Sequence, residues 1–266
     1  MKFAVLAIGL GWVVSGCTRP AAPSGESSTG QPADTAETTE TVEKRETASS
    51  PLGEGIVVSD EDRAIAGELR QAGLDYRAEG QYEDAIAALE KAVETDPESV
   101  SGHVILGWTL HLEKRADEAT KVLETARSRW PEEVSLLNAL GIVYLVGGKL
   151  EKAVETHEQA VTLNPENEIG HYNLSLAYQR LAEPGTAIEH AERATELEPF
   201  NPHPWVALAI AHQSNDDAEQ ASAAYQQATA LESGYLYSDF LGHLETAGFS
   251  AGQIEETEQL RQAVVE

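Results

Sequence analysis

The chain has 266 residues, of which 41 % are hydrophobic and 6 % aromatic, and its 45 acidic and 18 basic residues give a formal net charge of −27. Before residue 61 there are 8 acidic and 4 basic residues, so the remaining 206 residues carry a net charge of −23. A surface this negative repels phosphate backbones and anionic headgroups, which argues against nucleic-acid binding and leaves a solvated surface or one that attracts a basic partner or divalent cations.

The first residues have the pattern of a bacterial lipoprotein leader. Lys2 precedes an apolar run over residues 3–14, which is too short to span roughly 30 Å of hydrocarbon as a helix and is typical of a signal peptide. The stretch "VSGC" at residues 14–17 resembles the lipobox, which implies removal of residues 1–16 and lipid attachment at Cys17. The alternatives are an ordinary signal peptide with a chance cysteine, or an unusual cytoplasmic terminus. Thr18, where an Asp would favour inner-membrane retention, implies an outer-membrane anchor facing the periplasm if the source has two membranes.

Residues 17–58 are predicted to be the lipidated cysteine and a disordered tether. Residues 18–58 contain no aromatic residue, and Ser, Thr, Pro, Gly, Ala and Glu dominate them. Such a segment cannot bury enough apolar area to offset the entropy of ordering it. As a flexible chain it would span roughly 35 Å, enough to hold the folded part away from a membrane.

A repeating pattern begins after Ser59, which forms a capping-box pattern with Asp62 and predicts a helix start. Prolines then recur at a constant spacing, and between them large apolar residues, Leu-Gly pairs, Tyr and Ala return in one register; the prolines are Pro97, Pro131, Pro165 and Pro199. This spacing matches the period of about 34 residues that is typical of helix–turn–helix repeats.

On these residues the chain resembles the tetratricopeptide repeat family. The predicted fold is all-α: a right-handed α-solenoid of five repeats plus capping helices, with the repeat domain over 59–235 and a degenerate repeat or C-terminal cap over 236–266. The five repeats are 66–99, 100–133, 134–167, 168–201 and 202–235. Gly80 and Gly148 are predicted to supply the positive φ of the turn inside a repeat, a Pro184–Gly185 turn takes that place in repeat 4, and Gly248 separates the two capping helices.

The sequence predicts no enzyme, no metal site and no cofactor. It contains no glycine-rich phosphate loop, nucleophile elbow or zinc-protease helix. The eight histidines form no convincing metal-ligand pair with another His, Cys or Asp at helical spacing. His103 and His171 occupy the same repeat position, and we expect them to be packing or surface residues.

The resemblance implies a concave groove lined by the first helix of each repeat, at its second, fifth, ninth, twelfth and thirteenth positions. In this chain those positions hold Arg70, Leu74, Arg77, Val104, Trp108, His111, Leu112, Asn138, Ile142, Leu145, Val146, Ile169, Tyr172, Leu176, Gln179, Arg180, His203, Val206, Ile210 and Gln213. The apolar majority predicts a binding site for a partner's helix or extended segment, with Trp108, Tyr172 and Arg180 as anchors. Leu74 replaces the Asn of the family's carboxylate clamp, so that clamp is not predicted.

Two alternatives concern the groove and the role. The groove could be filled by the chain itself, through the C-terminal helix from Ser250 or through a second copy in a homo-oligomer. The predicted role is a lipid-anchored scaffold or assembly factor of the bacterial cell envelope. The alternative role is an adaptor or chaperone-like binder of transient envelope clients, for example for a protease or a cell-wall enzyme.

Overall fold

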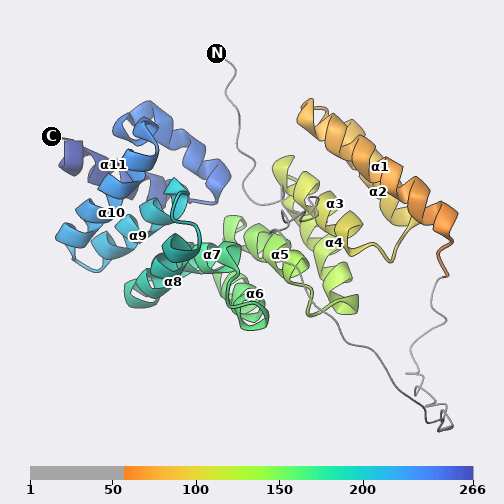
Figure 1. Cartoon of the computed structure of the whole chain (residues 1–266), viewed down its shortest axis with the longest axis horizontal. Coiled ribbons are helices and arrows are strands. Elements are labelled where there is room, and N and C mark those ends of the chain that lie inside the picture. Colours follow the sequence, from red (N-terminus) through yellow and green to blue (C-terminus); the bar gives the residue numbers. More distant parts are fainter. Residues whose placement is uncertain (1–56, 266) are drawn as a thin grey trace, which may run out of the picture. The chain divides into compact units, whose positions relative to one another are not determined.

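The computed structural model describes residues 57–265, and the predicted leader, Cys17 and nearly all of the predicted tether lie outside the described residues. Within this range the chain forms eleven α-helices, two 3₁₀ helices and no β-strand (Figure 1). The helices in chain order are α1 (Asp60–Ala78), α2 (Tyr82–Thr95), α3 (Val100–Leu112), α4 (Ala116–Arg129), α5 (Val134–Val146), α6 (Leu150–Leu163), α7 (Glu168–Arg180), α8 (Pro184–Leu197), α9 (Pro202–Ser214), α10 (Ala218–Leu231), η1 (Ser233–Leu236), η2 (Ser238–Ala247) and α11 (Ala251–Val265).

The α-helices follow the period that the prolines predict. The second helices α2, α4, α6, α8 and α10 begin at the same constant spacing as the prolines, and so do the first helices from α3 to α9. Each second helix packs on the first helix of its own pair and on the first helix of the next pair, and successive first helices also pack on one another. The described part of the chain is therefore an α-solenoid of helix pairs, which confirms the predicted fold class.

Helix α1 begins with the predicted capping box. The Ser59 hydroxyl accepts a hydrogen bond from the Asp62 backbone N–H at 3.0 Å, and the Asp62 carboxylate accepts one from the Ser59 backbone N–H at 3.3 Å. Asp60, Glu61 and Asp62 occupy the first turn, where the helix dipole favours negative charge.

The turn inside each helix pair holds one residue in the left-handed region. Gly80 and Gly148 have φ values of 76° and 73°, as predicted, and tolerate them without a steric cost. The equivalent residues of the other three pairs are Lys114, Ala182 and Asp216, with φ values of 61°, 59° and 59°. These three side chains are strained, because a Cβ in this region crowds the following carbonyl oxygen.

The prediction of a turn at Pro184–Gly185 is wrong. These two residues are the first residues of α8, and the turn lies two residues earlier, at Ala182. Proline is favoured at the first helical position because its missing N–H would have no partner there and its φ is already helical.

Close approach of the two helices in a pair depends on small residues in the first helix. A Cβ on Gly73 would lie 2.6 Å from Leu89, and one on Gly107 would lie 2.5 Å from Leu123. In the third pair the bulky partner is His157, whose Nε2 would lie 2.4 Å from a Cβ on Gly141. His157 is fully buried and neither of its ring nitrogens has a hydrogen-bond partner.

His103 and His171 have the same structural role, at the same position of their repeats. The Nε2 of each lies 3.2 Å from the carbonyl oxygen of the proline six residues earlier. The indole N–H of Trp205 donates to the carbonyl of Pro199 in the same way, at 3.2 Å. These half-buried rings supply a hydrogen bond to a carbonyl that the end of the preceding helix leaves unpaired.

The chain after α10 departs from the repeat. The predicted pair of capping helices is a 3₁₀ helix, η2, followed by α11, and Gly248 between them has a φ of 89°. We call residues 238–265 the C-terminal segment. Helix α11 packs on both α9 and α10, the first and the second helix of the last pair.

Candidate functional site

The inner side of the solenoid is formed by the first helices. Successive first helices contact one another, whereas α4, α6 and α8 lie on the outer side of the curve of helix pairs (Figure 1). The first helices, on which the family resemblance places the groove positions, therefore form one concave face. The residues along this face do not have the same exposure.

The ninth position of each repeat shows the difference most clearly. Leu74, Trp108 and Ile142 are half-buried in the first three repeats. Leu176 and Ile210, at the same position in repeats 4 and 5, are both 0 % exposed. We call the concave face of α1, α3 and α5 the open half and that of α7 and α9 the filled half.

The filled half is covered by the C-terminal segment. The Tyr172 hydroxyl donates to the carbonyl of Ala247 at 2.6 Å, and the Tyr172 ring lies 6.3 Å from the ring of Phe249, centroid to centroid. A Cβ on Gly248 would lie 3.8 Å from Leu176 and 3.9 Å from Leu145, so its backbone lies directly against the inner face. The C-terminal segment thus covers Tyr172, one of the predicted anchors, so a partner cannot contact it there.

A layer of side-chain amides joins α11 to α7. Gln253 is 2 % exposed and its Nε2 donates to the Leu176 carbonyl at 3.1 Å and to Gln179 Oε1 at 3.0 Å. Gln179 Nε2 in turn donates to Glu256 at 2.6 Å and to Ser214 at 2.9 Å. Burial raises the pKa of the Glu256 carboxyl, and the hydrogen bond from Gln179 opposes that shift. Because buried amides are costly unless paired, this network fixes the register of the segment on the face.

The open half exposes apolar side chains. Leu112 is 40 % and Val146 47 % exposed, and both lie at the last position of their helices. Trp108 is half-buried and its ring lies 5.2 Å from that of His111. Among the described residues, the hydrogen bonds and ring contacts of the C-terminal segment go to α7, α9 and η1, and none goes to α1 or α3.

Positive charge lies beside these apolar side chains. Arg77 donates to the Thr109 hydroxyl at 3.5 Å, and burial lowers its pKa. One guanidinium nitrogen of Arg70, Nη1, is buried without a hydrogen-bond partner. Burial also lowers the pKa of His111, so this imidazole is neutral near pH 7. Partly desolvated guanidinium groups favour a ligand that brings acceptor oxygens.

The remaining predicted groove residues lie between the helices or at the boundary of the two halves. Arg180 donates to the Leu145 carbonyl at 2.7 Å, and burial lowers the Arg180 pKa. Asn138 forms a reciprocal amide pair with Asn167, at 2.9 and 2.8 Å. The other fully or nearly fully buried predicted residues are Leu145, Val104 and Val206, and the half-buried ones are Ile169, His203 and Gln213.

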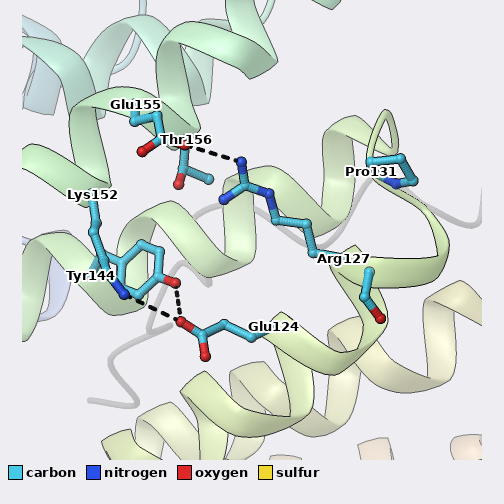
Figure 2. A pocket seen from close by; sticks show the side chains of 8 residues that line it. Glu124, Arg127, Pro131, Tyr144, Lys152, Glu155 and Thr156 are labelled. Atoms are coloured by element: carbon cyan, nitrogen blue, oxygen red, sulfur yellow. Dashed lines mark hydrogen bonds and ion pairs between the residues drawn. The ribbon is translucent and has the colours of Figure 1, made fainter.

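A shallow pocket of about 460 Å³ lies among α4, α5 and α6. Figure 2 shows that its charged groups face one another: Tyr144 donates to Glu124, Lys152 lies 3.5 Å from Glu124, and Arg127 lies 3.5 Å from Glu155. The hydrogen bond from Tyr144 lowers the pKa of Glu124. The charged groups of the pocket are therefore already paired with one another, and these pairs join repeat 2 to repeat 3.

Two further properties bound the chemistry of the described part. Between residues 57 and 265, no helix has both the length and the apolar character that crossing a bilayer requires. Over the same range, no group of three or more His, Cys, Asp or Glu side chains is arranged to hold a metal ion.

Helix pairs at a constant period, stacked into a solenoid with a concave inner face, define a tetratricopeptide-repeat scaffold. A family model described as "Psidin, N-terminal TPR repeats region" matches residues 74–232, and the chain belongs to this family of tetratricopeptide-repeat proteins. Proteins of this class bind other proteins and are generally non-enzymatic. A comparison with curated protein sequences gives no match.

Solved structures with the same fold include bacterial proteins. PilF of Pseudomonas aeruginosa is 22 % identical with a TM-score of 0.60, over 77 % of this chain and 94 % of that one. A thermophilic TPR protein of Thermus thermophilus is 23 % identical with a TM-score of 0.56, over 68 % and 98 %. The MamA protein is 21 % identical with a TM-score of 0.54, over 64 % and 92 %. At these identities the likeness concerns the fold.

Proposed function

We propose that the open half of the concave face binds an apolar segment of a partner protein, either a helix or an extended chain. The observation that carries this proposal is the exposure of Leu112 and Val146, 40 % and 47 %, on a face whose other half is covered. Exposed apolar side chains gathered on one surface are typical of an interaction site. Trp108, one turn before Leu112 on α3, supplies an aromatic anchor, and aromatic side chains dominate the binding energy of most interfaces.

The C-terminal segment indicates which contacts this kind of face makes. It uses an aromatic ring against Tyr172, a glycine close to the inner helices, and a glutamine that donates to a helix carbonyl. A partner segment in the open half would combine apolar contacts to Trp108 and Leu112 with acceptor groups for Arg70 and Arg77. The proposed activity is binding, without catalysis.

We further propose that the protein acts at the bacterial cell envelope, as a lipid-anchored scaffold or assembly factor. The support is the sequence of the leader, with its apolar run and the lipobox-like stretch that ends at Cys17. The composition of residues 18–58 is that of a tether, which would let the repeats reach partners at a distance from the membrane. Thr18 favours an outer-membrane anchor facing the periplasm.

The adaptor or chaperone-like role remains the alternative, because it would use the same surface. The open half is limited to three first helices, and small interfaces are typical of transient complexes. A scaffold predicts a complex that survives purification. An adaptor predicts clients that are retained only after crosslinking.

The test is crosslinked affinity capture from native membranes with the wild-type chain and the Trp108→Glu variant. The carboxylate that Trp108→Glu introduces should abolish capture of the groove partner, because an apolar partner segment cannot solvate this charge. Tyr76→Glu is the matched control, because Tyr76 is 39 % exposed on α1 but lies outside the groove positions.

The proposal holds if one set of captured proteins is lost with Trp108→Glu and kept with Tyr76→Glu. An identical set from all three chains would exclude the open half as the binding surface. A separate comparison of wild type with Cys17→Ser tests the anchor: without the lipid, the protein should leave the membrane fraction.

A further inference from the structure

The edge of the solenoid where each second helix ends changes character along the chain. The last residue of the second helix is Thr95 in the first pair and Arg129 in the second, but leucine in the next three; these leucines are Leu163, Leu197 and Leu231. Three residues later, in the turn to the next pair, Glu98, Glu132 and Glu166 are followed by Phe200. The same backbone positions are therefore polar in the early repeats and apolar in the late ones.

The apolar residues at this edge are exposed. Phe200 is 86 % exposed, and Tyr237, directly after η1 in the chain, is 66 % exposed. Leu163, Leu231 and Leu236 are 41 %, 38 % and 37 % exposed. We call these five residues the apolar edge. The fold does not require them, since the first three turns form with glutamate where Phe200 stands.

The surroundings of the apolar edge are mostly acidic, with Arg261, which donates to the Leu236 carbonyl at 3.3 Å, as the basic residue beside it. Between Arg193 and Arg261 the chain contains no lysine or arginine but eleven aspartates and glutamates. Glu198, Glu232 and Asp239 lie close to the edge in sequence, and all three are exposed. At the same edge in the first repeat, Glu98 forms an ion pair with Arg129.

We propose that the apolar edge is a second docking surface, distinct from the concave face, for a basic polypeptide segment with an apolar side. Exposed aromatic and aliphatic side chains supply the contact area, and the acidic surroundings select lysine and arginine around the partner's apolar residues. A second copy of this chain would bring like charge to the same place. An anionic membrane surface would be repelled for the same reason.

The test uses the purified full-length chain and a short helical peptide with leucine on one face and lysine on the other. Binding to the wild type is compared with binding to Phe200→Glu, which installs the residue that the first three repeats carry and so preserves the turn. We expect the Kd to rise by about tenfold or more, since a large apolar contact is lost. Tyr237→Ser, a neutral change at the same edge, should weaken binding in the same direction.

The sign of the charge change makes this test selective. Phe200→Glu adds a negative charge, so a purely electrostatic complex with the lysine peptide would become tighter. Tighter or unchanged binding to Phe200→Glu would therefore overturn the proposal. Equal binding of a peptide in which serine replaces leucine would overturn it as well.

Two further controls separate this surface from other occupants. Trp108→Glu, in the concave face, should leave the Kd of the lysine peptide unchanged, so failure of the groove proposal and failure of this one are distinguishable. A dimer that sedimentation detects in the wild type and not in Phe200→Glu would assign the edge to a second copy and overturn the proposal. Binding to anionic vesicles that is lost in Phe200→Glu would overturn it in favour of a membrane.

Discussion

The two halves of the concave face are built from the same repeat but differ in what covers them. Ile142 and Ile210 occupy the same position of repeats 3 and 5, yet Ile142 is half-buried and Ile210 is 0 % exposed. The difference comes from residues 238–265, which have lost the repeat pattern and lie on α7 and α9. A solenoid must cover the apolar face of its last repeats, and here the cover extends onto the concave face.

The largest expected effect comes from removing a contact of the filled half. Phe249 is 3 % exposed and packs on Tyr172, so Phe249→Ala should lower the free energy of unfolding by about 3 kcal/mol. Trp108→Ala is the comparison in the open half, where the side chain is half-buried already. Its cost should be smaller, about 1 kcal/mol. Urea unfolding of both variants measures the difference, and equal losses would contradict the division of the face.

A stabilising change is expected in repeat 3, the repeat of the open half that borders the filled half. His157→Leu restores the residue found at this position in the first two repeats, and it removes two buried ring nitrogens without partners. The gain should be about 2 kcal/mol at pH 7, because an unpaired buried polar group is costly. Leu123→His, the reverse exchange in repeat 2, should destabilise by a similar amount. Loss of stability in His157→Leu would show that the imidazole has a partner in solution.

The same residue predicts how stability depends on pH. Burial lowers the pKa of His157 to about 3, against about 6.5 in the unfolded chain. Between these values the unfolded chain binds a proton that the folded chain does not, so stability falls as the pH drops from 6.5, by about 1.4 kcal/mol per pH unit. His203, whose pKa burial lowers to about 4, adds a second contribution over a narrower range. Unfolding curves at several pH values measure this dependence, and the free energy of unfolding should change less with pH in His157→Leu than in the wild type.

The smallest expected effect concerns the turns inside the helix pairs. Ala182 has a φ of 59° where Gly80 and Gly148 stand in other pairs. Ala182→Gly should stabilise the chain by about 1 kcal/mol, because it relieves the strain of a Cβ in the left-handed region. Gly148→Ala should destabilise it by a similar amount. Thermal unfolding measures both, and a lower Tm for Ala182→Gly would contradict the assignment of strain.

Much of the fold was predictable because the same sequence pattern occurs in each of the five repeats. The spacing of Pro97 to Pro199 gives the period, Ser59 and Asp62 give the first helix start, and Gly80 and Gly148 give two of the turns. The turn at Ala182 was missed because neither alanine nor its neighbours carry a turn signal. It follows from the register alone, since Ala182 occupies the position in repeat 4 that Gly148 occupies in repeat 3.

The groove was predictable only as a set of positions. Which of these positions remain open depends on how residues 238–265 dock. This segment lacks the repeat pattern, so its position on the solenoid cannot be inferred by aligning it with the other repeats. The prediction that a C-terminal helix could fill the groove describes the filled half, where Gln253 bonds to Leu176 and Gln179. The unpartnered His157 was missed because its position is a core leucine in repeats 1 and 2. A signal was present in the exchange of that leucine for a polar residue.

The most direct test of the two-half account is the accessibility of matched cysteines. In a Cys17→Ser background, Ile142→Cys and Ile210→Cys place a single thiol at the same repeat position in the open and the filled half. The account predicts that a thiol reagent labels residue 142 at least about tenfold faster than residue 210, and that adding Phe249→Ala speeds labelling at residue 210 alone. Equal labelling rates at the two positions would contradict it.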